Sequence, residues 1–430
     1  MRILLRGGRI IDADGERTLD VEIGNDGRIA AVGTGLNGDL DLDASGCVIS
    51  PGFVDLHTHL REPGQEEAET IETGARSGSL GGYTALVAMP NTAPTTDCVA
   101  VVEQVRALGR RSTCEIVPSA AMTVDRAGTK MAPLGELVDV GVGIFTDDGT
   151  GLQDPRLMRR VMEYSTGLTR RLGRPVVLAQ HCEVSALSAG GYMHEGEWSS
   201  RLGIPGQPAE AEELMVMRDI ALVRLTGAHV HFQHLSTAGS VAMVRGAKAA
   251  GLPVTAEATT HHFTLTDAAC ATYDPVFKVH PPLRTGSDVA AVRAGLADGT
   301  IDAVATDHAP HASHVKERPF DEAPPGMLGL ETAFALTLSE SGLDLAEVLA
   351  VLSWRPAAIA GLAGRHGVSV IPGAPANICV VDPDQTWTVS GAAMASRSSN
   401  TPYEGQTLRG RVRHTISAGE PVVIDGEAQR

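Results

Sequence analysis

Eight short apolar runs, each ending in polar residues, recur through the middle of this 430-residue chain. In order they read VISPGFVDLHTH, YTALVAMPN, CEIVPSAAM, GVGIFTDDG, PVVLAQHCE, HVHFQHLST, PVTAEATTHH and IDAVATDHAP. Stretches of helical character, such as CVAVVEQVRALGRR and AEAEELMVMRDIALVRLTG, lie between them. Strands that alternate with helices form parallel sheets, and eight such units favour closure into a barrel. We therefore predict an α/β fold, a (β/α)8 TIM-like barrel, over residues 51–364.

The two ends of the chain have a different pattern. Residues 1–50 contain ILLRGGRIID and VEIGNDGRIAAVG, and residues 365–430 contain NICVVD, RVRHTISAG and EPVVIDG. These segments predict strands and turns, and neither end contains a long helical pattern. We expect the two ends to pack together as one small β-sandwich domain beside the barrel.

The composition excludes several classes of protein. No stretch approaches the ~20 apolar residues of a membrane span, and the first residues do not resemble a signal peptide. The six cysteines are scattered and form no CxxC motif, which favours a cytoplasmic protein with reduced thiols. The formal net charge of -17, without a basic stripe, argues against a nucleic-acid partner. An anionic substrate would need a local cationic pocket, because the whole chain repels it.

Residues that can bind metals follow five of the predicted strands. The first strand ends in His57 and His59, the fourth in Asp147 and Asp148, the fifth in His181, the sixth in His234 and the eighth in Asp307. In a parallel barrel these ends meet at one rim, where the chemistry takes place. The set exceeds the needs of one tetrahedral zinc ion and fits two metals that share a carboxylate. A lysine can also bridge two metals in such sites, but no lysine ends the fourth strand. One of the two neighbouring aspartates of that strand is therefore the candidate bridge.

The segment DLHTHLREP contains the first two of these residues. Side chains alternate along a strand, so His57 and His59 should point to one side. Asp55 should share that side, whereas Leu56 and Thr58 should take the other. Two imidazoles on one face provide half of a metal site, and Arg61 follows them closely.

Motifs along nearly the whole chain resemble those of the amidohydrolase superfamily, and specifically of the bacterial class I dihydroorotases. The matching stretches include PGFVDLHTHLREPG, GGYTALVAMPNT, FTDDG, HCE, HLST, VTAE, PPLR, ATDHAPHASHVK and NTPYEG. This resemblance implies an enzyme that reversibly closes N-carbamoyl-L-aspartate into (S)-dihydroorotate, the third step of de novo UMP synthesis. It also implies two zinc ions per chain, which hold a reactive hydroxide.

The resemblance also implies a role for individual residues. His57, His59 and Asp307 would hold one metal, His181 and His234 the other, and Asp148 would bridge them. Asp307 would also be the catalytic proton carrier, and the substrate contacts would be His59, Arg61, Asn91, His280, His311, Pro325 and Gly326. The chain departs from the family at three positions, with His280 in place of Asn, Pro325 in place of Phe and Thr260 in place of Pro. His280 either replaces the amide or turns away from the substrate.

Two other functions stay open. A related cyclic amidase (hydantoinase, dihydropyrimidinase or allantoinase) shares the scaffold, but it usually has a lysine bridge and does not need an arginine clamp. A non-catalytic scaffold for aspartate transcarbamoylase should have lost metal ligands, and this chain keeps all six. As partners we expect the small-molecule substrate, a second copy of the chain in a homodimer and, as a further candidate, aspartate transcarbamoylase. We expect no nucleic acid and no membrane.

Overall fold

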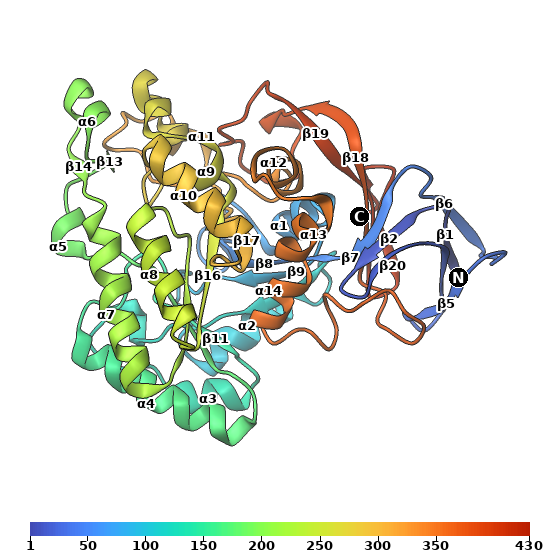
Figure 1. Cartoon of the computed structure of the whole chain (residues 1–430), viewed down its shortest axis with the longest axis horizontal. Coiled ribbons are helices and arrows are strands. Elements are labelled where there is room, and N and C mark those ends of the chain that lie inside the picture. Colours follow the sequence, from blue (N-terminus) through green and yellow to red (C-terminus); the bar gives the residue numbers. More distant parts are fainter.

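The computed structural model describes residues 1–430 and consists of a helix-rich part and a sheet-rich part (Figure 1). The helix-rich part is a barrel of strands surrounded by helices. The sheet-rich part lies beside it and contains both chain termini. The predicted fold class, a TIM-like barrel with a β-sandwich built from both chain ends, is confirmed.

Eight parallel strands form the barrel. They are β8 (Phe53–Thr58), β9 (Tyr83–Ala88), β10 (Glu115–Pro118), β11 (Ile144–Phe145), β12 (Val177–Gln180), β15 (His229–Phe232), β16 (Val254–Thr259) and β17 (Ala303–Ala305). Their pairing gives the orders β10-β9-β8 and β11-β12-β15-β16-β17. Parallel bridges from Ala120 to Phe145 and from Thr58 to His308 close the ring. Each predicted apolar run supplies one barrel strand, although the start of the first run (Val48–Pro51) forms β7 of the sandwich.

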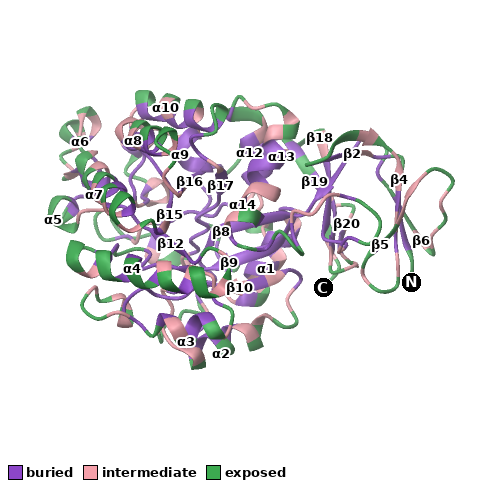
Figure 2. Ribbon diagram, turned by 60° about the horizontal axis from the view of Figure 1, so that its bottom comes forward, coloured by how far each residue is buried: buried purple, intermediate pink, exposed green.

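Helices surround the barrel, with buried faces toward the strands and exposed faces outward (Figure 2). The helices of eight or more residues are α1 (Ile71–Leu80), α2 (Val99–Gly109), α4 (Pro155–Leu172), α7 (Glu210–Thr226), α8 (Ala238–Ala249), α10 (Gly286–Ala297), α12 (Ala333–Glu340) and α13 (Leu345–Leu352). Local sequence sets their ends. In α4, Asp154 accepts hydrogen bonds from the first free backbone N–H groups, Pro155 opens the helix, and Gly173 ends it in the left-handed conformation.

Shorter elements lie in the connections between these parts. They are the helices α3 (Leu134–Asp139), α5 (Ser185–Ser188), α6 (Glu197–Leu202), α9 (Thr260–Thr264), α11 (Ser313–Lys316) and α14 (Trp354–Ile359), and the strands β13 (Met193–His194) and β14 (Gly206–Gln207). Helix α14 packs against β8 and β17, and its Ala357 joins the apolar cluster inside the barrel.

The sandwich joins the two ends of the chain. One sheet has the order β5-β4-β1-β6 and the other has the order β21-β20-β19-β18-β7-β2-β3. The N-terminal strands are β1 (Ile3–Arg6), β2 (Arg9–Asp12), β3 (Gly15–Thr18), β4 (Asp20–Ile23), β5 (Ile29–Gly33), β6 (Leu40–Asp43) and β7 (Val48–Pro51); the C-terminal ones are β18 (Ile378–Thr388), β19 (Thr407–Ser417), β20 (Glu420–Ile424) and β21 (Glu427–Ala428). Strand β7 pairs with β18 and fuses the two ends into one sheet. We propose domain boundaries near residues 50 and 365 on this basis.

The interior of the barrel changes character along its axis. One part is filled by small and branched side chains, among them Val54, Ala85, Val177 and Ala303. Close-packed aliphatic side chains make this part a solid support. Toward the carboxyl ends of the strands the buried side chains become polar, as with His231 on β15. The functional residues lie at that end.

Candidate metal centre and active site

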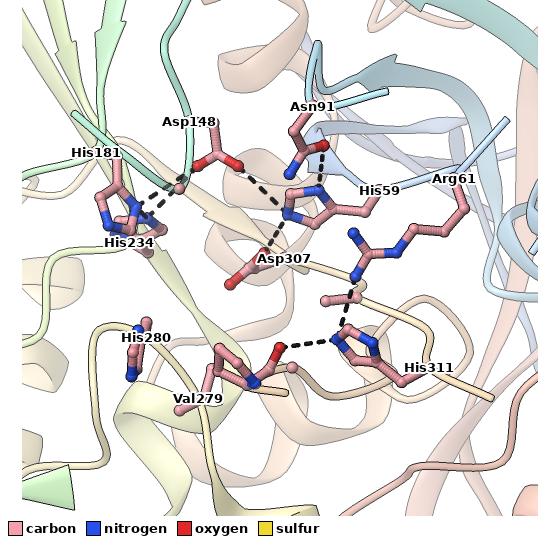
Figure 3. Close-up of a pocket in the computed structure, with 14 residues that line it drawn as sticks. His59, Arg61, Asn91, Asp148, His181, His234, Val279, His280, Asp307 and His311 are labelled. Carbon is pink, nitrogen blue, oxygen red and sulfur yellow. Dashed lines mark hydrogen bonds and ion pairs between the residues drawn. The ribbon is translucent and has the colours of Figure 1, made fainter. Parts of the chain in front are cut away.

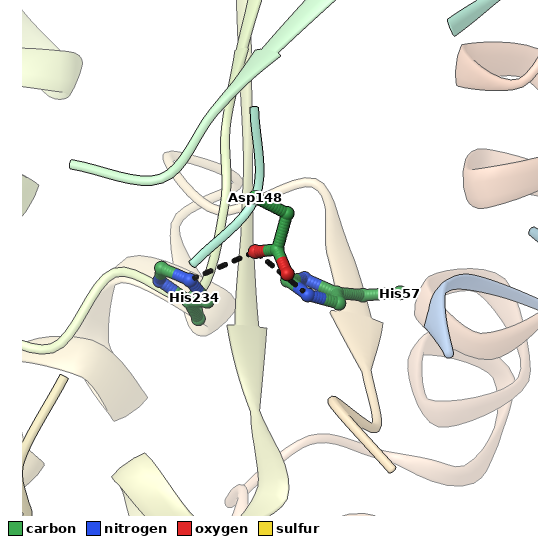
Figure 4. Close-up of side chains that lie close together, drawn as sticks. All are labelled: His57, Asp148 and His234. Carbon is green, nitrogen blue, oxygen red and sulfur yellow. Dashed lines mark ion pairs between the residues drawn. The ribbon is translucent and has the colours of Figure 1, made fainter. Parts of the chain in front are cut away.

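The six predicted metal ligands converge beyond the carboxyl ends of the strands, and all are buried (Figures 3 and 4). Asp148 lies at their centre. Its Oδ1 atom is 3.2 Å from His57 Nε2, 3.6 Å from His181 Nδ1 and 3.9 Å from His234 Nε2. Its Oδ2 atom is 3.5 Å from His59 Nε2. Both oxygens of this carboxylate therefore face imidazole nitrogens, and each oxygen faces a different group of them.

Asp307 lies on the side of Asp148 where His57 and His59 are. Its Oδ1 atom is 3.0 Å from His59 Nε2 and 3.5 Å from His57 Nε2. His57, His59 and Asp307 form one group whose candidate ligand atoms lie within 4.8 Å of one another, and His57, Asp148 and His234 form a second such group. Two groups that share a residue have the arrangement expected for two neighbouring ions.

Three features of these residues fit bound cations. His57 Nε2 is buried and makes no hydrogen bond, although it lies beside Asp148. His181 Nδ1 and His234 Nε2 face each other at 2.9 Å, so two ring nitrogens converge on one point. Imidazole and carboxylate together are the ligands that Zn²⁺ prefers. The residues present therefore fit a metal centre.

The two carboxylates stay ionised in this buried setting. Burial raises the pKa of Asp148, but the neighbouring His57, His181 and His59 more than offset this and hold that pKa well below its usual value. Burial likewise raises the pKa of Asp307, and the charges of His57 and His59 and a hydrogen bond from His59 lower it overall. Both side chains are thus available as anionic ligands.

Glu257, a buried residue for which the sequence predicted no role, orients His57. His57 Nδ1 donates to Glu257 Oε1 at 2.9 Å, and Glu257 Oε2 lies 3.0 Å from His231 Nε2. Burial raises the pKa of Glu257, but these two hydrogen bonds lower it overall to about 2. A carboxylate that accepts a hydrogen bond from Nδ1–H keeps the proton on Nδ1 and leaves the Nε2 lone pair free for a metal. The acidic residue inside the apolar VTAE strand was the available signal.

The two neighbouring aspartates of the fourth strand have different surroundings. Asp147 accepts hydrogen bonds from the backbone N–H of Thr123 (3.0 Å) and from its hydroxyl group, and it does not face the histidines. Asp154 caps α4. Of the three nearby aspartates, only Asp148 reaches the metal ligands.

Asp55 does not lie on the same side of the strand as His57 and His59, so that prediction is wrong. Its Oδ2 accepts from the Thr58 hydroxyl at 2.6 Å and its Oδ1 from the Thr306 N–H at 3.0 Å, so it ties β8 to β17 instead of facing the metal ligands. The register between β8 and β9 shifts between Asp55 and Thr58. This irregularity interrupts the strict alternation on which the expectation depended.

Three residues of the site have left-handed backbone conformations. The φ angles are 61° at Arg61, 34° at His234 and 45° at Asp307. Such angles are strained for residues other than glycine and persist only where the surroundings enforce them. The fold thus holds these side chains in positions that an unconstrained chain would avoid.

A cavity of about 230 Å³ adjoins the metal ligands. It is lined by His59, Arg61, Asn91, Asp148, Gly149, His181, His234, Val279, His280, Asp307, Ala309, His311, Pro325 and Gly326. All seven predicted substrate contacts are in this set (Figure 3). Gly149, Val279 and Ala309 were not predicted; Gly149 and Val279 adjoin predicted residues, and Ala309 lies two positions from both Asp307 and His311.

Arg61 carries a buried positive charge without an acidic partner. Its Nε atom donates to the Pro310 carbonyl at 3.0 Å, and Nη2 lies 3.3 Å from His311 Nε2. No carboxylate lies within ion-pair distance of it. Burial lowers the pKa of Arg61 only to about 10, so the guanidinium stays charged at neutral pH. A buried cation without a partner is costly unless an anion joins it.

His280, the departure from the family pattern, lies at the cavity wall (Figure 3). The side-chain amide of Gln207 donates to the Gly191 carbonyl at 2.9 Å and to His280 Nε2 at 3.1 Å. Burial lowers the pKa of His280 to about 4, which keeps the ring neutral at neutral pH. Because Nε2 accepts the hydrogen bond, the ring proton lies on Nδ1.

The loop at the opposite wall is fixed through its carbonyl groups. Lys316 Nζ donates to the carbonyls of Pro275 (2.7 Å), Pro324 (3.0 Å) and Gly326 (3.1 Å). His311 Nε2 donates to the Pro325 carbonyl at 2.8 Å. The loop therefore has a defined position beside the metal ligands.

The chain is similar in sequence to proteins of one family. A family model described as dihydro-orotase-like matches residues 46–240. The dihydroorotase of Streptomyces coelicolor is 47% identical to the chain, and that of Mycobacterium bovis is 46% identical; each match covers 99% of this chain and 99% of the relative. The dihydroorotase of Pelotomaculum thermopropionicum is 44% identical over the same shares.

Among solved structures, the chain is similar in fold to cyclic amidases. The L-hydantoinase (dihydropyrimidinase) from Arthrobacter aurescens matches with a TM-score of 0.88 at 22% identity, over 100% of this chain and 97% of that one. The dihydropyrimidinase from Brevibacillus agri NCHU1002 matches with a TM-score of 0.85 at 22% identity, over 100% and 96% of the two chains. At this level of identity the likeness supports the fold alone.

Proposed function

The chain belongs to the dihydroorotase family, and we propose that the residues around the 230 Å³ cavity carry out the family's reaction, the reversible ring closure of N-carbamoyl-L-aspartate to (S)-dihydroorotate. The observation that carries this proposal is the pairing of two features across one cavity. Metal-ligand side chains form one wall, and the unpaired cation of Arg61 lies at another. A cyclic amide that bears a carboxylate fits both.

We propose that the cofactor is two zinc ions. His57, His59 and Asp307 would hold one ion, His181 and His234 the other, and Asp148 would bridge them. The hydrogen-bond-free Nε2 of His57 and the central position of Asp148 support this assignment. Two bound divalent ions lower the pKa of water and polarise a carbonyl group.

In this proposal Asp307 carries the proton of the reaction. Its Oδ1 lies 3.0 Å from His59 Nε2 among the metal ligands, and its Oδ2 makes no hydrogen bond within the chain. In hydrolysis, Oδ2 would accept a proton from the attacking water and give it to the leaving ring nitrogen. In ring closure the same oxygen would take the proton from the carbamoyl nitrogen as that nitrogen attacks the carboxyl carbon, and would give it to the departing oxygen, which leaves as water.

Arg61 and its neighbours would bind the substrate carboxylate. A planar guanidinium can donate two parallel hydrogen bonds to a carboxylate. Asn91 Oδ1 accepts from His59 Nδ1 at 3.0 Å, so the NH₂ group of Asn91 is left to donate to a ligand. His311, beside Arg61, would complete this clamp.

Removal of the clamp should weaken the enzyme in a specific way. Arg61→Met should cost about 2–5 kcal/mol in kcat/KM for dihydroorotate, because a charged, bidentate partner of the substrate is lost. Arg61→Lys keeps the charge without the fork and should recover only part of the activity. If Arg61→Met hydrolysed dihydroorotate as well as the wild type, the carboxylate clamp would be wrong. The natural substrate would then be better assigned as an uncharged ring.

His280 provides a test of how the pocket departs from its family. If Nδ1 donates a hydrogen bond to the substrate, His280→Ala should lose activity and His280→Asn should keep much of it. The pH profiles of His280→Asn and the wild type should differ only at the acidic end, near the pKa of about 4. Steady-state kinetics across pH measure this. Equal kinetics for His280→Ala and the wild type would mean that a water or a backbone group serves instead.

The two alternative functions fit the site less well. A hydantoinase-type enzyme usually has a bridging lysine, but Lys316 and Lys278 donate to backbone carbonyls of the loops beside the cavity, and Asp148 takes the central position. A scaffold without catalysis would not need six converging ligands. Turnover of dihydroorotate, with hydantoin and dihydrouracil as comparison substrates, tests the proposal. Preference for an uncharged ring would contradict it.

The cellular location and the macromolecular partners of the chain are also proposals. No helix in the structure combines the length and the apolar composition that crossing a membrane requires. We propose a cytoplasmic enzyme of pyrimidine synthesis, with no nucleic-acid partner, on the grounds of its cysteine pattern and net charge of -17. Association with aspartate transcarbamoylase is a proposal that the family resemblance alone supports.

A further inference from the structure

The inner face of α7 carries two buried carboxylates that have no part in the proposed reaction. They are Glu212 and Asp219, which lie seven residues apart and therefore on one side of the helix. Val216 lies between them and packs in an apolar cluster of the barrel. Burial of a carboxylate is costly unless its oxygens are hydrogen-bonded, so the partners of these two side chains indicate what they do.

Glu212 holds the loop that follows β15. Its Oε1 atom accepts hydrogen bonds from the backbone N–H groups of Ser236 (3.1 Å) and Thr237 (3.2 Å). Its Oε2 atom accepts from the Ser236 hydroxyl group, which itself accepts from Arg284 Nε at 3.1 Å. These contacts begin two residues after His234, whose backbone φ of 34° is strained. A carboxylate that fixes the backbone just beyond this strain prevents His234 from relaxing away from the other metal ligands.

Asp219 holds the end of β12. Its Oδ2 atom accepts from Gln180 Nε2 at 2.8 Å, and Gln180 is the residue before His181. Gln180 Oε1 accepts from the backbone N–H of Leu152 at 3.2 Å, so both the oxygen and the nitrogen of this amide are bonded. Arg218 Nε donates to Asp219 Oδ1 at 2.8 Å and balances its charge. Asp219 thus fixes the strand end that carries His181.

Both carboxylates act on ligands of the same proposed ion, called here the second ion. His181 and His234 would hold it, and the segments of both are bound to α7. The ligands of the other ion lie at the ends of β8 and β17, and no side chain of α7 forms a hydrogen bond with those strands. Figure 1 shows α7 beside α4 and α8, on the side of the barrel away from the β-sandwich.

We propose that Glu212 and Asp219 are positioning residues for the second ion. Neither lines the cavity, so they act through His234 and His181 and not on the substrate. This inference rests on the proposed two-ion centre and adds that α7 sets the affinity for one ion and not for the other. Loss of a group that orients a metal ligand typically lowers metal affinity about 10–100-fold.

Zinc titration of the metal-free, full-length protein tests this inference. Equilibrium dialysis measures the ions bound per chain over a range of free zinc concentrations. The wild type should bind two ions. Glu212→Ala should bind one ion with unchanged affinity and the other about 10–100-fold more weakly. Asp219→Ala should give the same pattern, and it carries the test alone if Glu212→Ala does not fold.

A double variant identifies which ion is affected. His234→Ala removes a ligand of the second ion and should leave a chain that binds a single ion tightly. Addition of Glu212→Ala to this chain should not change the affinity for the remaining ion, because the two changes act on one site.

Two further variants distinguish positioning from a general loss of stability. Val216→Ala removes buried apolar contacts on the same face of α7, so it should lower the melting temperature and still bind both ions with wild-type affinity. Glu212→Gln keeps an oxygen that can accept from the backbone N–H groups of the loop, so it should recover part of the lost affinity. A thermal melt of each metal-free variant shows that it is folded.

The outcomes separate this inference from the proposed function. Wild-type affinity for both ions in Glu212→Ala and Asp219→Ala, or an equal weakening of both ions, would overturn the inference and leave the two-ion centre intact. Loss of an ion from Val216→Ala would also overturn it, because the effect would then follow from stability alone. A wild type that binds fewer than two ions would overturn the two-ion centre itself, and this inference with it.

Discussion

The Asp307→Asn variant should retain most of its metal and lose dihydroorotate turnover by about 10²–10⁴-fold, the usual scale of general acid–base catalysis. An asparagine can still offer a carbonyl oxygen to a metal beside His57 and His59, but it cannot take up a proton. In the wild type Asp307 is ionised and its Oδ2 makes no hydrogen bond within the chain, so it is free to do so. Steady-state kinetics and metal analysis on the same preparation measure both effects.

The metal content distinguishes two ways in which Asp307→Asn can fail. A variant that loses both metal and turnover would show that the ionised carboxylate of Asp307 is needed to hold the metal. A variant with full metal content and near-normal turnover would end its assignment as the proton carrier. Asp298→Asn is a suitable control, since Asp298 pairs with Arg245 on the outside of the barrel and should keep normal activity.

The second large effect is expected at the bridge. Asp148→Ala should lose bound metal and turnover together, because this carboxylate faces imidazole nitrogens of both groups of ligands. Its neighbour is the matched control. Asp147→Ala should keep both metals, although it should lower the free energy of unfolding by about 1–3 kcal/mol, because a buried Thr123 N–H loses its acceptor.

Metal analysis and thermal unfolding of these two variants measure the difference. Equal metal content in Asp148→Ala and the wild type would contradict the bridge. Loss of metal from Asp147→Ala, with Asp148 intact, would mean that the Thr123 contact positions the whole loop after β11.

The barrel was predictable because its signal is repeated. Eight apolar runs of similar length, each ending in polar residues, leave few other folds, and the repeat tolerates errors at single boundaries. The candidate ligands were predictable for the same reason, since the ends of parallel strands must meet at one rim. The boundary between β7 and β8 could not be seen, because VISPGFV is one apolar run and the sandwich and the barrel divide it.

Other features depend on pairing between distant segments. Glu257 points inward and accepts a hydrogen bond from His57, a residue 200 positions away in the sequence. Asp55 was assigned to the wrong side because alternation holds only in a regular strand, and the register shift in β8 is a tertiary effect. The contact between Gln207 and His280 likewise joins two loops of unrelated sequence.

The most direct test of the whole account is metal analysis combined with a dihydroorotate turnover assay on the purified wild-type chain. We expect two zinc ions per chain, loss of turnover when a chelator removes them, and recovery when zinc is returned. N-carbamoyl-L-aspartate should be the product, and the reverse ring closure should be measurable with the same protein. Full turnover without metal, or two bound metals with no action on dihydroorotate, would contradict the account.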